Sequence, residues 1–107
     1  MPRVSVVIPT YNRASDLRRA LLSVQRQTCT DWECLIVDNH STDDTDDVVR
    51  SFADPRLRLL KVQNNGVIAV SRNLGLRSAV GRYVAFLDSD DWWKPRKLNT
   101  WCAHMAT

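Results

Sequence analysis

The chain has 107 residues, a length typical of one small domain, and residues 1–107 are expected to form a single unit. Hydrophobic residues make up 44% and charged residues 25% of it, which excludes a disordered or fibrous chain. The formal net charge is +3, but the basic residues are scattered rather than gathered in a block. The composition therefore does not favour a nucleic-acid partner.

Strand-like and helix-like patterns alternate along the chain. Short β-branched or aromatic runs predict buried strands at Val4–Ile8, Trp32–Val37, Leu57–Val62 and Tyr83–Leu87. Apolar residues at helical spacing predict helices around Leu17–Val24, from Ser41 to Phe52, over Ile68–Val80 and from Pro95 to Met105. This order implies right-handed crossovers and a mainly parallel sheet with helices on both faces, which is a three-layer α/β/α fold.

Local signals mark the ends of these elements. Pro9 is expected to end the first strand, and Asn12 or Ser15 to cap the first helix. Ser41 is expected to cap the second helix, and Gly81 lies in the C′ position expected after the third. Basic residues interleaved in the third strand indicate an edge of the sheet.

No targeting signal is visible. The run Val4–Ile8 is too short for a signal peptide, and no stretch approaches the length of a membrane span. Cys29, Cys34 and Cys102 are odd in number and form no CxxC motif, so neither a disulfide nor a thiolate metal site is expected. We expect a cytoplasmic protein, either free or peripheral to the inner face of the membrane.

The last predicted strand ends abruptly in three carboxylates, those of Asp88, Asp90 and Asp91. In open α/β sheets, ligands bind beyond the carboxyl ends of the strands. In extended backbone Asp88 and Asp90 project to the same side, and converging carboxylates repel unless a cation or a proton holds them. Oxygen ligands of this kind suit Mg²⁺ or Mn²⁺, so one hypothesis is a divalent metal that bridges the chain to a diphosphate. The alternative is a solvated turn that caps the next helix.

Four stretches occur in an order and at spacings that are specific together, although each alone is modest. They are Val6–Arg13, Ile36–Asp43, Asn65–Gly66 with Ser71–Gly75, and Gly81–Asp91. With them the chain resembles, over nearly its whole length, the nucleotide-binding half of a family 2 glycosyltransferase with the GT-A fold. The resemblance implies a nucleotide-sugar donor, most often a UDP-sugar.

The resemblance also implies roles for residues that bind the nucleotide. Thr10 and Tyr11 are similar to the residues that hold the nucleoside, and Tyr11 offers an aromatic face for a base. Asp38 is similar to the carboxylate that accepts a hydrogen bond from the base, usually uracil. Arg72 is similar to a residue near the base and the phosphates, where bidentate contact is possible.

Asp88 and Asp90 match the DxD pair of the family. Asp88 would be oriented to the ribose or the metal, and Asp90 would bind Mn²⁺ or Mg²⁺ directly. A divalent cation stabilises the charge that grows on the leaving diphosphate. Asp91 is expected to orient the loop or cap the last helix. Of Trp92 and Trp93, one is expected in the core and the other at the surface, and neither is assigned to the site.

The chain departs from the family pattern in two ways. His40 stands where the family often has Gly, and a turn with positive φ would suit His less well. The half that binds a saccharide or lipid-linked acceptor and carries the general base of the inverting displacement is expected to lie outside this chain, which would be either a fragment of a longer enzyme or a stand-alone product, so no catalytic residue is assigned. Without a neighbouring strand from that half the last predicted strand keeps an open edge, and we expect a homodimer.

Two other functions remain open. The same fold can bind a nucleotide or nucleotide sugar without turnover. A dinucleotide-binding or receiver domain is the third reading, but a Rossmann site needs a glycine-rich turn after the first strand, and residues 9–12 contain no glycine.

Overall fold

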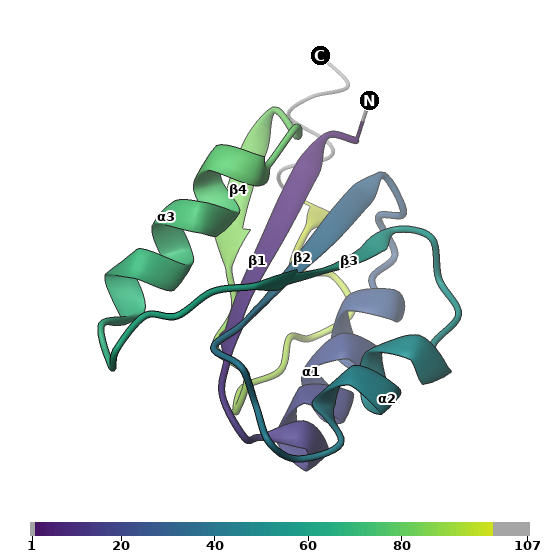
Figure 1. Cartoon of the computed structure of the whole chain (residues 1–107). Coiled ribbons are helices and arrows are strands. Elements are labelled where there is room, and N and C mark those ends of the chain that lie inside the picture. Colours follow the sequence, from purple (N-terminus) through teal and green to yellow (C-terminus); the bar gives the residue numbers. More distant parts are fainter. Residues whose placement is uncertain (1, 100–107) are drawn as a thin grey trace.

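The computed structural model describes residues 2–99, in which four parallel strands form one sheet with helices on both faces (Figure 1). The elements are β1 (Val4–Thr10), α1 (Ala14–Gln25), β2 (Trp32–Asp38), α2 (Thr45–Ser51), β3 (Leu57–Lys61), α3 (Ile68–Ser78) and β4 (Tyr83–Phe86). The strand order is β3-β2-β1-β4. Helices α1 and α2 cover one face and α3 covers the other, which confirms the three-layer fold.

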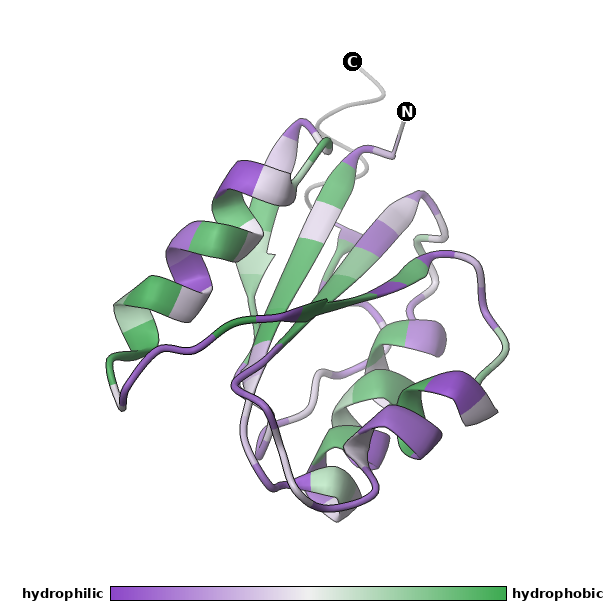
Figure 2. Cartoon of the chain, in the orientation of Figure 1, coloured by the Kyte–Doolittle hydropathy of each residue, from purple (hydrophilic) through white to green (hydrophobic). Residues whose placement is uncertain are grey.

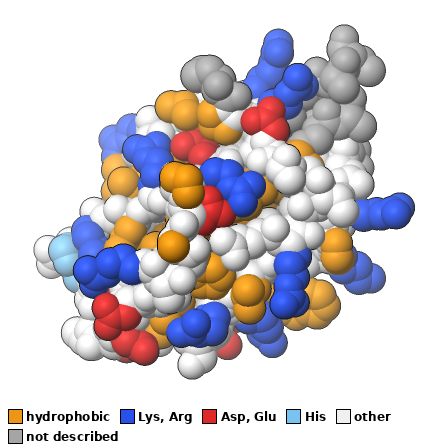
Figure 3. Space-filling model, turned by 90° about the vertical axis from the view of Figure 1, so that its right-hand side faces the viewer, with side chains coloured by type: hydrophobic (Ala, Val, Ile, Leu, Met, Phe, Trp, Pro, Cys, Tyr) orange, Lys and Arg blue, Asp and Glu red, His pale blue; other side chains and the backbone are white. Residues whose placement is uncertain are grey.

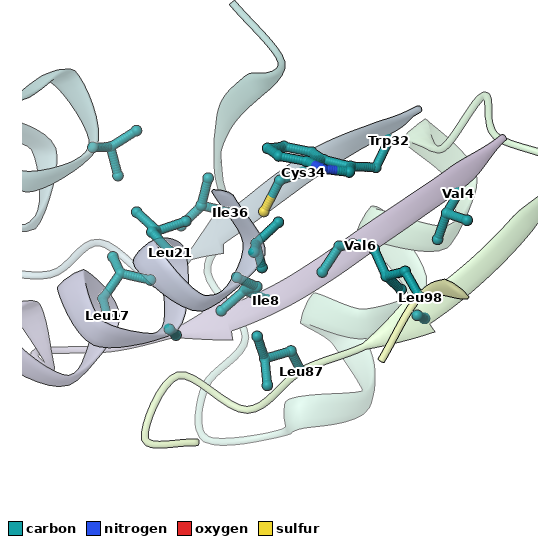
Figure 4. Close-up of a cluster of buried hydrophobic side chains, with 14 of the residues drawn as sticks. Val4, Val6, Ile8, Leu17, Leu21, Trp32, Cys34, Ile36, Leu87 and Leu98 are labelled. Carbon is teal, nitrogen blue, oxygen red and sulfur yellow. The ribbon is translucent and has the colours of Figure 1, made fainter. Parts of the chain in front are cut away.

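Alternating side chains of β1 build a core on each face of the sheet. Val4, Val6 and Ile8 pack in the larger cluster with residues of α1 (Figure 4), while Val7 packs on the other face with Leu74 of α3. Both faces of the central strands are therefore largely apolar, because successive side chains point to opposite sides, and the buried polar residues Ser5 and Glu33 are hydrogen-bonded to each other. Figure 2 shows hydrophobic central strands and an α3 of mixed hydrophilic and hydrophobic character, and Ile68, Val70 and Leu76 of this helix are exposed.

The first strand extends beyond its predicted end. It continues through Pro9, which lies opposite Val37, and ends at Thr10. A proline lacks only its own backbone donor. The hydrogen bonding of β1 continues after the proline, because the N–H of Asn39 donates to the carbonyl of Thr10 at 3.0 Å.

The predicted helix caps are wrong for α1 and α2. Neither of the two residues expected to cap α1 does so; the N–H of Ala14 instead donates to Asp43 of the following loop at 3.1 Å. Helix α2 begins only at Thr45, whose N–H also donates to Asp43, at 3.2 Å. The carboxylate of Asp43, in the loop between β2 and α2, therefore accepts a backbone N–H from the first turn of each helix. Ser41 caps neither helix.

Two glycines permit close packing against β1. Helix α3 ends at Ser78, and Gly81 does not have the positive φ of a C′ glycine. A Cβ atom on Gly81 would lie 2.5 Å from the hydroxyl oxygen of Ser5. A Cβ atom on Gly75, inside α3, would lie 2.4 Å from a methyl carbon of Val7. Gly75 thus lowers the amphipathy of α3 but brings the helix onto the sheet.

Strand β4 is an outer strand of the described sheet rather than a central one. It pairs with β1 alone among the described strands, and Phe86 is 45% exposed. Strand β3 forms the other edge, as its basic residues indicated. Residues 95–98 form turns, with Leu98 buried in the core, Asn99 is helical, and residues 100–105 of the predicted last helix lie outside the described residues.

Two further expectations concern single side chains. Trp93 packs against the core and Trp92 is exposed, as expected. The expectation that the chain has no disulfide is wrong, because Cys29 is disulfide-bonded. An odd number of cysteines still allows one pair, and Cys34 is free and buried. Between residues 2 and 99, no helix combines the length and apolar character needed to cross a bilayer.

Candidate functional site

The carboxyl ends of the strands place polar residues along one edge of the sheet, at its lower end in Figure 1. The strand register aligns Thr10, Asp38 and Lys61 at the ends of β1, β2 and β3. Asp88 follows β4 by two residues on the far side of β1. Parallel pairing therefore gathers residues that are up to 78 positions apart in sequence.

Asp38 is fully buried and has partners on both carboxylate oxygens. Lys61 Nζ lies 2.6 Å from its Oδ2, and the N–H of Ser41 lies 3.2 Å from each oxygen. The Ser41 hydroxyl donates to Oδ1. A buried carboxylate is tolerated only with such partners. The predicted base acceptor thus stands at the expected strand end, held by its own chain.

Lys61 was missed in the sequence. Its ammonium group also donates to Asp46 of α2, so it joins the ends of β2 and β3 to that helix. Burial alone would lower the pKa of Lys61, but its hydrogen bonds to Asp38 and Asp46 outweigh burial and raise it. Lys61 ends β3 opposite Asp38, which ends β2. This pairing can be recognised only once the register of the two strands is known.

A pocket of about 470 Å³ opens beside these strand ends. It is lined by Tyr11, Asn39, His40, Gln63 and Asn65. Tyr11 is 53% exposed, so its ring is free to contact a ligand. The lining has an aromatic wall and amide groups but no carboxylate, lysine or arginine, which suits an uncharged planar group. The three amide residues were not predicted, although they follow the second and third predicted strands directly.

The loops that carry this lining have left-handed backbone at three non-glycine residues. His40 has φ +51°, Asn65 has φ +52°, and Asn12, next to Tyr11, has φ +49°. The turn at His40 therefore has the positive φ that a histidine suits less well than a glycine. Bonds between the loops hold this geometry: Asn12 N–H donates to Ser41 Oγ at 2.8 Å, and Thr42 N–H donates to Asn12 Oδ1 at 2.7 Å.

Thr10 presents an unused polar atom. Its side chain is buried, and its hydroxyl has no hydrogen-bond partner among the described residues. Buried hydroxyl groups are nearly always paired, so an unpaired one at a strand end indicates a place for a ligand or water. Thr10 lies opposite Asp38 in the sheet.

The structure brings Arg72 and Asp88 together. Arg72 Nη2 of α3 lies 3.5 Å from Asp88 Oδ1, and the same guanidinium stands 5.9 Å from the centre of the Phe86 ring. Both charged side chains are partly exposed. A cation and an anion are thus offered to solvent at the end of β4.

The acids after β4 lie in a turn rather than in extended backbone, so the extended geometry predicted for Asp88 and Asp90 is wrong. The N–H of Asp91 donates to the carbonyl of Asp88 at 3.0 Å, which closes the turn. The carbonyl of Asp90 accepts from Arg19 at 3.2 Å, and its side chain is exposed. Asp91 accepts from the N–H of Trp92 at 2.8 Å, so it orients the loop as expected.

Within residues 2–99, no group of three or more His, Cys, Asp or Glu side chains is arranged to hold a metal ion. The chain alone offers the carboxylates of Asp88 and Asp90, whose oxygens are of the type that Mg²⁺ and Mn²⁺ prefer. Such a set fits a metal that takes its remaining ligands from a diphosphate and water.

Figure 3 shows Lys and Arg side chains interspersed with acidic and apolar ones on the face it presents.

The model of the family described as glycosyl transferase family 2 matches residues 5–107. The chain belongs to this family. Among curated members it is 44% identical over 99 residues to a putative teichuronic acid biosynthesis glycosyltransferase, TuaG, of Bacillus subtilis, covering 91% of this chain and 39% of that protein. It is 41% identical over 95 residues to WfgD of Escherichia coli, a UDP-Glc:alpha-D-GlcNAc-diphosphoundecaprenol beta-1,3-glucosyltransferase, covering 89% of this chain and 38% of WfgD.

Two solved structures share the GT-A fold of this family 2 chain. TarS 1-349 of S. aureus in complex with UDP superposes with a TM-score of 0.89 at 30% identity, over 97% of this chain and 32% of that one. The mannosyltransferase PcManGT from Pyrobaculum calidifontis, in complex with GDP-Man and Mn²⁺, has a TM-score of 0.81 at 33% identity, over 96% and 31%. The chain thus spans well under half the length of these relatives.

Proposed function

We propose that this chain is the donor-binding region of a metal-dependent, inverting glycosyltransferase that uses a UDP-sugar. The observation that carries the proposal is the pocket with an aromatic wall and amide groups at the strand ends of a family 2 chain. A nucleobase is uncharged and planar, and such a group fits a pocket of this lining. The acidic turn after β4 supplies the charge that the pocket lacks.

The nucleoside is assigned to the first two strand ends. Tyr11 offers a half-exposed ring on which the base stacks. Thr10 offers its unpaired hydroxyl to the nucleoside. Asp38 offers a carboxylate that accepts an N–H, as N3 of uracil requires, and Lys61 Nζ lies 2.6 Å from its Oδ2.

The diphosphate is assigned to α3 and the turn after β4. Arg72 would bind phosphate oxygens, and Asp90 would hold Mn²⁺ or Mg²⁺ with Asp88 turned to the ribose or the metal. When bound, the cation would neutralise charge that develops on the leaving diphosphate. The UDP complex of TarS and the GDP-Man and Mn²⁺ complex of PcManGT support this choice of ligands.

The acceptor and the general base are assigned to a part of the enzyme that this chain does not contain. The chain covers only 38% of WfgD, whose name specifies a diphosphoundecaprenol acceptor. A saccharide or lipid-linked acceptor of a cell-envelope polysaccharide, used at the inner face of the membrane, follows from that likeness. The single displacement would invert the anomeric centre.

The test is calorimetric titration of UDP with and without Mn²⁺. We expect binding to strengthen at least tenfold with Mn²⁺, and Asp90→Ala to abolish this gain, because the carboxylate that holds the cation is removed. Asp47→Asn, on the exposed face of α2, is the control for loss of one negative charge. Metal-dependent binding that survives Asp90→Ala would remove Asp90 from the site.

A second candidate is nucleotide-sugar binding without turnover. It is favoured by the coverage of under 40% of each curated relative above. Incubation of the chain with UDP-glucose and Mn²⁺, followed by chromatography of the nucleotides, separates the two. If UDP is released from UDP-glucose faster than in the absence of protein, the chain catalyses hydrolysis of the donor. If UDP-glucose binds and no UDP is released, the chain is a binding region only.

A further inference from the structure

The hydroxyl group of Ser41 connects the two parts of the proposed nucleoside site. It accepts the N–H of Asn12 at 2.8 Å and donates to Asp38 Oδ1. The direction of both bonds is fixed, because a backbone N–H only donates and a carboxylate only accepts. One side chain therefore holds the β1–α1 loop and the end of β2 at the same time.

The β1–α1 loop depends on these contacts for its shape. Asn12 has a left-handed backbone, with φ +49°, and its side-chain oxygen accepts the N–H of Thr42 at 2.7 Å. Tyr11 immediately precedes it and exposes half of its surface. The backbone next to Tyr11 is thus held by bonds to residues 41 and 42, in the loop between β2 and α2.

Asp38 has few acceptor positions left. A carboxylate offers about four lone-pair positions, and here three donors use them: Lys61 Nζ, the Ser41 hydroxyl and the Ser41 N–H. Asp38 is also fully buried in the ligand-free chain. A base therefore reaches this carboxylate only when the loop that contains Ser41 shifts. Such a shift would alter the bonds of Ser41 to both Asp38 and Asn12.

We propose that Ser41 is a positioning residue that couples the Asp38 carboxylate to the loop carrying Tyr11. The base acceptor and the stacking face then move and settle as one unit. The proposal rests on the assignment of Asp38 and Tyr11 to the nucleoside. Ser41 touches neither the phosphates nor the metal in that assignment, so its effect is confined to the base.

The test compares Ser41→Ala and Ser41→Thr with the wild-type chain. UMP and inorganic pyrophosphate with Mn²⁺ are the two probes, each titrated by calorimetry. We expect Ser41→Ala to weaken UMP binding about tenfold, as loss of two hydrogen bonds predicts, and to leave pyrophosphate binding unchanged. Ser41→Thr keeps a hydroxyl and restores UMP binding to within about threefold. Ser15→Ala, at an exposed position of α1, is the matched control.

A second measurement does not depend on nucleotide. Amide hydrogen exchange at Asn12, followed by NMR, should accelerate at least tenfold in Ser41→Ala and remain unchanged in Ser15→Ala. Unchanged exchange overturns the coupling, whatever the nucleotide result. Faster exchange with unchanged UMP affinity, or equal weakening of UMP and pyrophosphate, overturns the positioning role. A wild-type chain that binds pyrophosphate with Mn²⁺ but not UMP overturns the assignment of the base.

Discussion

Arg72 Nη2 lies 3.5 Å from Asp88 Oδ1, so a cation of α3 faces the first acid after β4. The guanidinium also stands over the ring of Phe86, which limits its orientations. Both charged side chains are partly exposed, and such pairs contribute about 0 to 1 kcal/mol. The pair is therefore easily exchanged for contacts with a phosphate and a divalent cation.

The first prediction is that loss of Arg72 changes the affinities for UDP and for Mn²⁺ in opposite directions. In Arg72→Ala the affinity for UDP should fall about tenfold, because a phosphate partner is lost. The affinity for Mn²⁺ alone should rise, because the carboxylate of Asp88 loses its neighbouring positive charge. Titration of each ligand measures both effects. Arg77→Ala, on the same helix, is the control, and a fall in Mn²⁺ affinity with Arg72→Ala would contradict the argument.

The second prediction concerns acid stability. Asp54 accepts two bonds from the Arg56 guanidinium, at 3.1 and 2.8 Å, and this pairing lowers its pKa to about 2. Because its pKa is lower in the folded state, its contribution to stability is complete above pH ~4 and is lost as the pH falls towards 2. It amounts to about 1 to 2 kcal/mol after solvent screening.

Asp54→Asn should therefore lower the free energy of unfolding at pH 7 by about this amount and by much less at pH 2. Urea unfolding at several pH values measures the difference. Asp31→Asn is a matched control, since Asp31 is paired with Arg3 at the exposed surface. A difference between wild type and Asp54→Asn that does not change with pH would contradict the pairing.

The third prediction tests the contact between α3 and β1. Gly75→Ala should destabilise the chain by about 1 to 2 kcal/mol, because the new methyl group meets the stiff Val7 side chain. The higher helix propensity of alanine offsets only part of this cost. Combining Gly75→Ala with Val7→Ala should restore part of the loss, so the two changes are not additive. Thermal unfolding of the four chains gives the coupling directly.

The fourth prediction concerns self-association. Strand β4 is an outer strand of the described sheet and exposes Phe86, so the wild-type chain should form dimers that dissociate on dilution. Phe86→Lys should weaken them, because a lysine on an edge strand discourages pairing. Light scattering after size exclusion measures the mass. Val80→Lys changes an equally exposed residue outside the strand, and a monomer at high concentration would exclude the dimer.

The fold followed from the sequence wherever burial decided the structure. Strands β1 and β2 were recognisable because a strand covered on both faces needs continuous apolar residues. Helix starts were not, because the cap of α1 is Asp43, 29 residues from Ala14. Gly81 was misread as a helix stop for the same reason, since its neighbour Ser5 is distant in sequence.

The candidate site shows the same division. Residues at strand ends could be placed from the sequence, because every parallel strand points its carboxyl end to the same edge. The partners of Asp38 could not, since the contact with Lys61 depends on the pairing of β2 with β3. The turn at Asp88 was predicted only as the alternative to an extended end, because local propensity does not distinguish the two.

His40 combines a left-handed backbone with a side chain that faces the pocket. Its loop is fixed by the bonds of Ser41 and Asn12 rather than by the preference of the imidazole residue. Residue 40 can therefore vary among glycine, asparagine, aspartate and histidine, which tolerate left-handed backbone, without altering the path of the chain. Evolution can change the chemistry of the pocket wall at this position, and with it the nucleotide selected, while the scaffold stays constant.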